Sequence, residues 1–216
     1  MLEKMGSFFD DRLDGYEEHQ LNCIDFAREF YPFTAGCLPW GKSVSVLDLG
    51  CGTGLELEAY FHANPTAKVT GIDLAPGMLA KLKKKFSSRD IRLILGSYFD
   101  VPLGSAVYDA AVSVESLHHF TKEEKLPLYR QLHQALKPDG YFILTDYFAA
   151  SEEEEAFDQA ELSRLKALQG ITGGEFYHYD TPLTLEHEIE ALSAAGFSSV
   201  EVLNRWGATC TIRAAK

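Results

Sequence analysis

A glycine-rich loop stands between acidic side chains. Glycines occur at every second position from Gly50 to Gly54, Asp48 lies near the end of the apolar run that precedes them, and Glu56 and Glu58 follow. Glycines let a chain turn sharply and approach a ligand closely, and the helix that follows offers free N–H groups. Such a loop can bind an anion or a nucleoside, so the acids around it decide which ligand fits.

The carboxylate of Asp48 argues against a dinucleotide at this loop. A pyrophosphate would lie close to that charge, and like charges repel most strongly at reduced dielectric. The spacing also departs from the dinucleotide pattern G-x-G-x-x-G, because Leu55 stands at its third glycine position. With S-adenosylmethionine the interaction with Asp48 would be attractive, since this ligand carries a sulfonium and an ammonium but no phosphate. We expect Asp48 to attract the ammonium, while the backbone of Gly50–Gly54 takes the carboxylate or packs against the ribose.

A second acid, Asp73, ends the next strand pattern, about twenty residues beyond the first glycine. An acid at this distance can accept hydrogen bonds from both ribose hydroxyls of a nucleoside. It would do so for a nicotinamide dinucleotide as well as for S-adenosylmethionine, so it does not separate the two. The alternative interpretation of Asp73 is a helix N-cap.

Alternating strand and helix patterns position these residues. Apolar runs rich in β-branched residues predict strands at 44–49, 68–74, 91–95, 108–114, 141–148, 199–204 and 209–213. Helical spacing and capping residues predict helices at 16–30, 55–62, 76–86, 121–137, 151–168 and 184–196. The turn 137–140, with Pro and Gly, is expected to separate the helix at 121–137 from the next strand.

This alternation predicts an α/β fold: a Rossmann-like, doubly wound, mostly parallel seven-stranded sheet with an antiparallel last strand and helices on both faces. The last two strand patterns are joined by a short turn and should form an antiparallel pair. Ligands on such sheets bind at the carboxyl ends of the strands, where the strand order reverses. The glycine loop, the end of the second strand and the end of the fourth should therefore surround one crevice.

The sequence predicts a lid, a sheet domain and a cap inserted into that domain. Residues 1–40 look helical and are predicted to form an N-terminal lid, and residues 41–216 should form the sheet domain. Within that domain, residues 151–183 are predicted to be an inserted cap over the substrate.

Composition limits the class of partner. The formal net charge of −12 disfavours nucleic acid, whose binding depends on Lys and Arg, and no apolar run is long enough to span a bilayer. The four cysteines form no C-x-x-C pair, and the N-terminus has no apolar signal region, so a cytoplasmic protein with free thiols is expected. The oligomeric state is not indicated.

Four sequence blocks carry a family resemblance. VLDLGCGTG, GIDLAPGML, YDAAVSVESLHH and LKPDGYFILTD occur in this order between residues 44 and 148. As a set they resemble the class I S-adenosylmethionine-dependent methyltransferases. The resemblance implies that Asp48 and the loop residues Gly50, Cys51 and Gly52 line the methionine end of the cofactor, and that Asp73 holds its ribose.

The resemblance also implies an adenine site, with one departure. Leu74 and Met78 should pack on the adenine. After the third strand the family usually has Gly-Asp, whose acid accepts the adenine amino group, but here Ser97 stands at the acid's position and Tyr98 follows. Either the Ser97 hydroxyl or Asp100 is left to make that contact.

Candidate residues for chemistry follow the fourth and fifth strands. The resemblance places Glu115 near the methionine moiety. His119 and Tyr147 are predicted as catalytic residues and His118 as a substrate contact, because all three should face the crevice. The alternatives are packing histidines and an aromatic ring that covers the sheet. A metal site formed by the two histidines and Asp146 is not expected, because the spacing matches no established ligand pattern.

A loop rich in aromatic residues, Glu175–Asp180 with the sequence EFYHYD, is predicted to close over the substrate. Tyr177 and His178 are its proposed substrate contacts, and Arg205, in the turn before the last strand, is a further one. The alternative is an ordered loop whose rings plug the core.

The function predicted is transfer of a methyl group from S-adenosylmethionine to a small soluble acceptor. No particular base is required, because positioning the acceptor and expelling water supply much of the rate gain. Two alternatives stay open: a non-catalytic S-adenosylmethionine-binding protein, and an NAD(P)-dependent oxidoreductase on a similar sheet.

Overall fold

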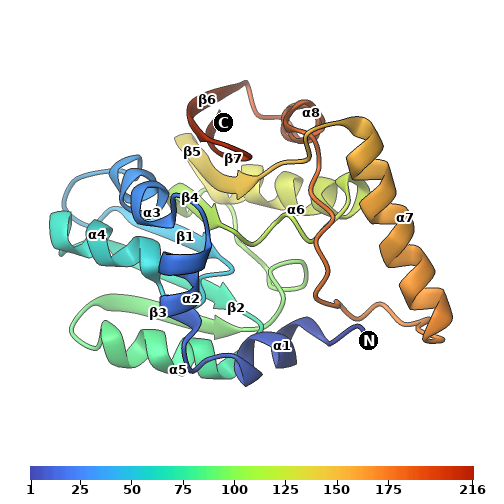
Figure 1. Ribbon diagram of the computed structural model, residues 1–216. Coiled ribbons are helices and arrows are strands. Elements are labelled where there is room, and N and C mark those ends of the chain that lie inside the picture. Colours follow the sequence, from blue (N-terminus) through green and yellow to red (C-terminus); the bar gives the residue numbers. More distant parts are fainter.

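The computed structural model describes all residues, Met1–Lys216, and contains one seven-stranded sheet (Figure 1). The strands are β1 (Ser45–Leu49), β2 (Lys68–Asp73), β3 (Asp90–Leu95), β4 (Tyr108–Val114), β5 (Leu136–Tyr147), β6 (Ser199–Trp206) and β7 (Thr209–Ala215). Their order is β3-β2-β1-β4-β5-β7-β6. Neighbours from β3 to β5 pair in parallel, while β7 is antiparallel to both β5 and β6. The predicted fold class is therefore confirmed, including the antiparallel pair at the end of the chain.

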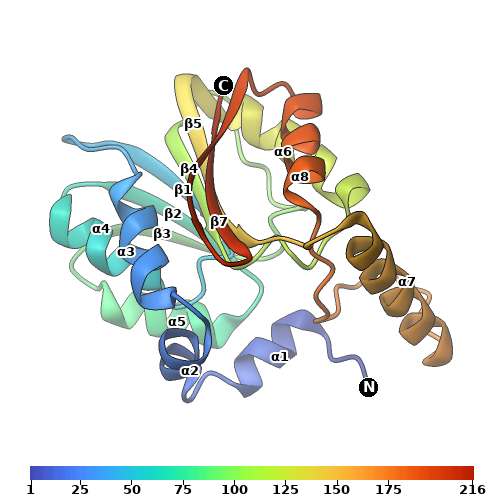
Figure 2. The same cartoon turned by 45° about the horizontal axis from the view of Figure 1, so that its top comes forward.

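Helices cover both faces of the sheet (Figure 2). They are α1 (Met5–Asp11), α2 (Tyr16–Cys23), α3 (Ala27–Gly36), α4 (Leu55–Ala63), α5 (Pro76–Lys85), α6 (Lys122–Ala135), α7 (Glu152–Leu168) and α8 (Leu185–Ala195). None of them combines the length and the apolar character needed to cross a bilayer.

Two hydrophobic cores follow from the alternation of side chains along the strands. Leu47 and Leu49 of β1 belong to the core that α6 and α8 cover. Val46 of the same strand belongs to the core under α3, α4 and α5. Asp48 shares the face of Val46, which directs its carboxylate toward α4. This geometry decides where the acid of the glycine loop lies.

The prediction of one helix over residues 16–30 is wrong. Phe26 has a φ of 62°, in the left-handed region, and separates α2 from α3. Phe30 and Tyr31 of α3 are buried on the sheet, whereas α2 buries none of its residues. One straight helix could not pack flat on the sheet and also lie across the strand ends, so the chain turns between the two.

The expected strand at 141–148 begins earlier, at Leu136, directly after α6. Leu136 pairs with Tyr108, but the next pair is Tyr141 with Ala110, so residues 137–140 bulge out of the ladder. The prediction of a separate turn at 137–140 is therefore wrong: these residues lie within β5, at an irregularity of the kind where Pro and Gly are tolerated in a strand.

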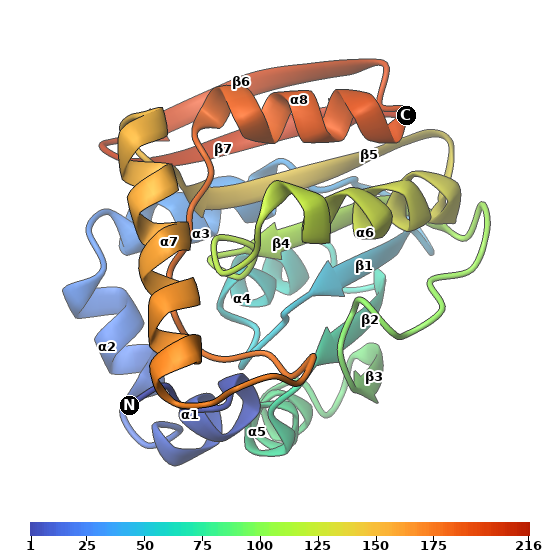
Figure 3. The same ribbon diagram turned by 90° about the vertical axis from the view of Figure 1, so that its right-hand side faces the viewer.

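The N-terminus lies beside a distant segment of the chain. Figure 3 shows α1 and the connection after α7 next to each other, with α7 running along the edge of the molecule. The backbone N–H of Met5 donates to the carbonyl of Phe176 (3.0 Å), and that of His178 donates to the carbonyl of Glu3 (2.9 Å). Residues 3–5 and 176–178 are thereby fastened together, on the side of the sheet where the parallel strands end.

Candidate functional site

The glycine loop follows β1 and turns with the help of positive φ angles, 73° at Gly50 and 72° at Gly54. The N–H groups of Gly50 and Cys51 both donate to the carbonyl of Ile72, at 2.9 and 3.2 Å. A β-carbon added at Gly50 would lie 2.1 Å from Oγ of Ser116. Only glycine fits this position, because both the backbone conformation and the close approach of the β4 end exclude a side chain.

The carboxylate of Asp73 holds the glycine loop against the end of β2. Its Oδ2 accepts a hydrogen bond from the N–H of Gly52 and its Oδ1 from that of Ala75, both at 2.8 Å. Burial raises the pKa of this carboxyl, and these two backbone donors oppose the rise. Each oxygen keeps a further lone pair, and the residue lines a cavity. Asp73 can therefore hold the loop and still accept hydrogen bonds from a ligand.

Asp48 is placed behind the loop and not on the cavity wall. It is 1% exposed, and Glu56 of α4 beside it is 4% exposed. Asp48 Oδ2 and Glu56 Oε1 have no hydrogen-bond partner. Burial, together with Glu56, raises the pKa of Asp48 well above its ordinary value. Two adjacent buried carboxyl groups do not both ionise readily, so this pair differs from the exposed anionic wall expected from the sequence.

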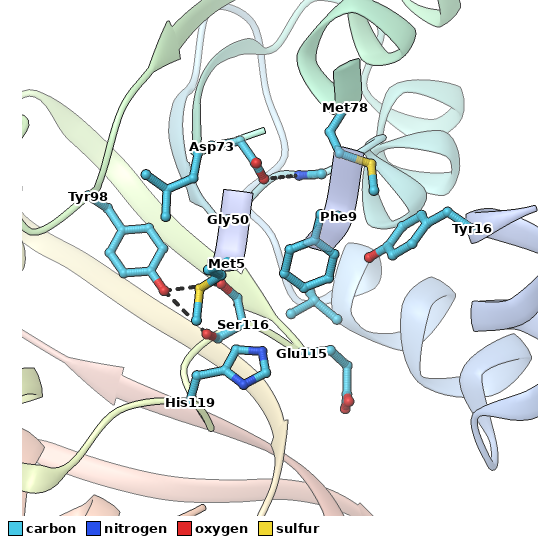
Figure 4. A pocket seen from close by; sticks show the side chains of 13 residues that line it. Met5, Phe9, Tyr16, Gly50, Asp73, Met78, Tyr98, Glu115, Ser116 and His119 are labelled. Atoms are coloured by element: carbon cyan, nitrogen blue, oxygen red, sulfur yellow. Dashed lines mark hydrogen bonds between the residues drawn. The ribbon is translucent and has the colours of Figure 1, made fainter. Parts of the chain in front are cut away.

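A narrow cavity of about 50 Å³ lies at the strand ends (Figure 4). Its walls come from the carboxyl ends of β1, β2 and β4, from the segment after β3, and from α1, α2 and α5. The predicted cofactor residues that line it are Gly50, Gly52, Asp73, Leu74, Met78, Tyr98 and Glu115, joined by His119. Cys51 and Ser97 are buried and lie outside this set, and the Ser97 hydroxyl accepts a hydrogen bond from the N–H of Phe99 (3.1 Å).

Three residues of the N-terminal helices close this narrow cavity: Met5 and Phe9 of α1, and Tyr16 of α2. The Tyr16 hydroxyl oxygen would lie 3.8 Å from a β-carbon added at Gly52. Met5 and Phe9 were missed as site residues, because nothing in the local sequence indicates where α1 packs. The sequence predicted a lid in this region but not which side chains enter the cavity.

Glu115 brings an unusual carboxyl group to the cavity. It adopts a φ of 49°, which for a non-glycine residue costs of order 1–3 kcal/mol and is concentrated at functional sites. Its Oε1 is buried without a hydrogen-bond partner. Burial, and then the neighbouring Asp146, raise the pKa of Glu115 to about 8. Such a group is stabilised by a nearby positive charge, which would restore its ionised form.

A larger cavity of about 690 Å³ adjoins the first and shares four of its residues. The shared residues are Phe9, Tyr16, Glu115 and His119. His118, Tyr147, His178 and Asp180 line the larger cavity alone. This volume lies within the roughly 300–1,000 Å³ range of small-molecule sites. The two cavities are therefore adjacent, and these four residues form the junction between them.

His118 is oriented by Asp146 at the end of β5. Its Nδ1 lies 2.6 Å from Asp146 Oδ1, and Oδ2 of the same carboxylate accepts the N–H groups of Leu117 (2.9 Å) and His118 (3.1 Å). Burial alone would lower the pKa of His118, but Asp146 raises it. Burial alone would raise the pKa of Asp146, but His118 lowers it. The carboxylate thereby fixes both the ring and the backbone of the segment after β4, a role that was not predicted.

His119 is paired in the same way with Asp180. Its Nδ1 lies 3.0 Å from Asp180 Oδ1 and 3.2 Å from the carbonyl oxygen of Tyr179. Burial, and then His118, lower the pKa of His119 to about 4, so this ring is neutral near pH 7. Burial and Asp180 raise the pKa of Tyr147, which therefore keeps its proton. Among the predicted catalytic residues, His119 lies between the two cavities and Tyr147 lies on the wall of the larger one.

Two predicted substrate residues are not brought to the site. Tyr177 forms an isolated β-bridge with Lys4 and lines neither cavity. Arg205 is exposed on β6, an edge strand separated from the cavity by β7 and β5. His178, the other residue predicted from the same loop as Tyr177, does line the larger cavity, and its ring stacks on Phe8. The sequence did not reveal that β7 lies between β5 and β6, and this strand order places Arg205 away from the crevice.

Comparisons with known proteins indicate the family of the chain. The family model described as "Methyltransferase domain" matches residues 46–140. An uncharacterized methyltransferase of Oceanobacillus iheyensis is 31% identical over 134 residues, which cover 61% of each chain. The erythromycin 3''-O-methyltransferase of Saccharopolyspora erythraea is 25% identical and is matched over 73% of this chain and 51% of its own. The chain thus spans only about half to three fifths of the length of these two relatives.

Among solved structures, a putative O-methyltransferase from Nostoc punctiforme superimposes with a TM-score of 0.72 at 22% sequence identity. The match covers 99% of this chain and 62% of the other. At this level of identity the likeness concerns the fold, and it extends over the N-terminal helices as well as the sheet.

Proposed function

Because this chain belongs to the class I S-adenosylmethionine-dependent methyltransferases, we propose that it transfers a methyl group from that cofactor to a small-molecule acceptor. One observation carries the proposal: a narrow cavity at the glycine loop adjoins a larger one, and His119 lies on the wall of both. A donor and an acceptor held in these two spaces would meet at the junction. The name of the erythromycin 3''-O-methyltransferase relative describes methyl transfer to a small molecule, which supports the same acceptor class.

The polar groups of the narrow cavity fit S-adenosylmethionine. Asp73 keeps free lone pairs for the ribose hydroxyls, and Gly50 and Gly52 line the cavity without side chains of their own. The unpartnered carboxyl of Glu115 suits the ammonium group better than Asp48 does, because Asp48 does not line the cavity. When bound, S-adenosylmethionine supplies an electrophilic methyl group on its sulfonium. We therefore propose Glu115 for the ammonium contact that the sequence had suggested for Asp48.

The volume of the narrow cavity, in contrast, is too small for the cofactor, so part of its wall must move before the cofactor can bind. About 50 Å³ is far below the roughly 300 Å³ that small-molecule sites start from. Met5 and Phe9 contribute to the small volume, because they come from α1 and close the cavity from outside the sheet. We propose that α1, fastened to residues 176–178, withdraws to admit the cofactor and returns to exclude water from the reaction.

The acceptor is proposed to lie in the larger cavity, beneath the same lid. His119 would contact the reacting atoms at the junction, and its neutral ring can accept a proton through Nε2 while Nδ1 faces Asp180. Asp146 acts as a positioning residue through His118. Tyr147 keeps its proton and is proposed as a hydrogen-bond donor to the acceptor.

Product analysis and calorimetry test this function. The protein is incubated with S-adenosylmethionine and a panel of small amines, alcohols, phenols and thiols, and S-adenosylhomocysteine is quantified by mass spectrometry; calorimetry compares S-adenosylmethionine with NAD. Acceptor-dependent S-adenosylhomocysteine supports the proposal. Cofactor binding without product across the panel favours the non-catalytic binding protein, and preferential binding of NAD favours the oxidoreductase.

A further inference from the structure

We propose that His118, His119 and Asp180 form a binding site for one divalent transition-metal ion in the wall of the larger cavity, where His119 adjoins the narrow one. One possible ligand atom from each residue lies within 4.8 Å of those of the other two. The proposal goes beyond the methyl-transfer function, and its binding component does not depend on it. It contrasts with the expectation from the sequence, which considered the two histidines with Asp146 and found no ligand pattern.

The two distances from Asp180 to the histidines are close to those between ligands of one metal ion. Asp180 Oδ1 lies 3.6 Å from His118 Nε2 and 3.0 Å from His119 Nδ1. Atoms that bind one ion at about 2.0–2.2 Å lie roughly 3–3.5 Å apart in tetrahedral or octahedral geometry. Small side-chain rotations are therefore sufficient to close the triad around an ion. The third residue lies far along the chain from the adjacent histidines, which explains why residue spacing alone did not reveal the site.

The surroundings of His118 resemble the outer shell of a metal site. Metal-binding histidines usually donate their second ring N–H to a carboxylate or carbonyl, which fixes the tautomer and the ring. Here Nδ1 of His118 lies 2.6 Å from Asp146 Oδ1, and the carboxylate is itself held by two backbone N–H groups. Nε2 is thereby left to face Asp180. A ring required only to pack against its neighbours would not need this arrangement.

Charge in the larger cavity also favours a cation. The aspartates Asp11, Asp14 and Asp180 line it, whereas Arg12 is the only Lys or Arg side chain that does so. Both terminal nitrogens of Arg12 are bound to the carboxylate of Glu3, at 3.1 and 3.0 Å. The guanidinium is therefore already paired. A divalent ion would compensate the surplus negative charge of the walls.

The donor set indicates the class of ion. Two imidazole nitrogens and one carboxylate oxygen suit Zn²⁺, Mn²⁺, Fe²⁺ or Co²⁺, whereas Ca²⁺ and Mg²⁺ prefer oxygen alone. Nδ1 of His119 can carry a proton toward the carbonyl of Tyr179, 3.2 Å away, with Asp180 Oδ1 at 3.0 Å. With an ion on Nδ1, the neutral ring carries its proton on Nε2, so in the metal-bound form His119 is a ligand and not the base. Three protein ligands leave coordination positions open toward the cavity.

The open positions indicate an acceptor class, and this step rests on the proposed function. A hydroxyl oxygen of the acceptor bound to the ion would lie beside His119, next to the cofactor cavity. Its proton would be released to water on coordination, and the oxygen would then form a bond to the methyl carbon while the carbon–sulfur bond breaks and sulfur keeps the electron pair. An acceptor with a hydroxyl group is therefore favoured over a simple amine.

Metal titration tests the site directly. Protein freed of metal with a chelator is titrated with Zn²⁺, Mn²⁺ and Co²⁺ by calorimetry, and Co²⁺ binding is followed by its visible absorption. We expect close to one ion per chain, and a loss of affinity of at least about tenfold in Asp180→Asn and in His119→Ala. Asp14→Asn is the matched control, because it removes a charge from the same cavity without removing a ligand. Circular dichroism checks that each variant is folded.

The outcomes separate the metal site from the methyl-transfer function. No binding near one ion per chain, or equal affinity in Asp14→Asn and Asp180→Asn, overturns the metal site and leaves a hydrogen-bond network only. Metal binding without S-adenosylmethionine binding supports the site while the proposed function fails. Metal binding with acceptor methylation that persists unchanged in the chelated protein would overturn the role assigned to the acceptor hydroxyl.

Discussion

The imidazole of His178 stacks on the ring of Phe8, with ring centroids 3.5 Å apart and an angle of 9° between the planes. The two residues lie far apart in the sequence. Around this pair, residues 3–5 and 176–178 exchange backbone hydrogen bonds, and Lys4 forms an ion pair with Glu175 (2.6 Å). α1 is therefore held over the strand ends by a segment that also lines the larger cavity. The contact couples the lid of the cofactor cavity to the acceptor cavity.

Removing this stack should loosen the lid. In His178→Ala, we expect faster amide hydrogen exchange in residues 3–9, because the backbone hydrogen bonds between the two segments lose the packing that protects them. Cofactor release should accelerate by a few-fold, while the exchange of β1 and β4 stays unchanged. Phe157→Ala, at a 68% exposed position on α7, is the control. Uniform exchange in all segments of both variants would argue against a lid.

Phe9 should control the entry of the cofactor. In Phe9→Ala, the narrow cavity becomes larger and its outer wall weaker, so we expect the association rate of S-adenosylhomocysteine, measured by stopped-flow fluorescence, to rise. Phe33→Ala, at a half-buried aromatic on α3 that packs against Trp206, is the control. If both variants bind at the wild-type rate, α1 does not need to move.

Asp73→Ala should weaken binding of S-adenosylmethionine by about 1–3 kcal/mol, the usual cost of losing hydrogen bonds to a charged group. Part of the loss comes from the glycine loop, because Asp73 accepts the N–H of Gly52. Calorimetry measures the dissociation constant, and Asp90→Ala, at an exposed acid at the start of β3, serves as the control. An unchanged dissociation constant would contradict the assignment of Asp73 to the ribose.

Gly50→Ala should lose cofactor binding and stability together. The added β-carbon meets Oγ of Ser116 at 2.1 Å, and φ at this position is 73°, so both strain and a clash oppose the substitution. A loss of more than about 1 kcal/mol in the free energy of unfolding is expected, as measured by urea denaturation. Gly36→Ala, where a β-carbon meets nothing within 4 Å, should be close to neutral. Similar stabilities for the two variants would contradict the close approach of β1 and β4.

Asp48→Asn should flatten the pH dependence of stability. The pKa of Asp48 is raised in the folded protein, so the folded state holds a proton that the unfolded state has lost above the ordinary aspartate pKa of about 4. Stability due to this group is therefore lost as the pH rises from about 4 through the folded pKa, by at most about 1.4 kcal/mol per pH unit. Asparagine carries no proton to lose. Urea denaturation at pH 5 and pH 8 should show a smaller difference in the variant.

A control for this pH effect is Glu58→Gln, which changes an exposed carboxyl on the same helix as Glu56. It should leave the difference between pH 5 and pH 8 as in the wild type. A variant Asp48→Asn with the wild-type slope would show that the buried pair titrates through Glu56 instead.

The sequence was sufficient for the framework of the fold. The β-branched runs and capping residues are local signals, so they placed the seven strands and most helices within a few residues. The turn at the glycine loop and the acid at the end of β2 are also local, and Gly50, Gly52 and Asp73 do meet at one cavity. Local pattern failed at residues 16–30, where the change of direction at Phe26 depends on what the two helices pack against.

Contacts between distant segments decided the rest. The alternation along β1 turns Asp48 toward Glu56 and away from the cavity, and the end of β4 brings Glu115 there instead. Met5 and Phe9 enter the site because α1 is fastened to residues 176–178, which no local pattern encodes. The sequence by itself thus determined the sheet, the loop and the class of ligand, since each depends on residues that are neighbours in the chain. Only the tertiary structure decided which side chains close the two cavities and bring Asp180 to the histidines, because those contacts join segments that the chain keeps far apart.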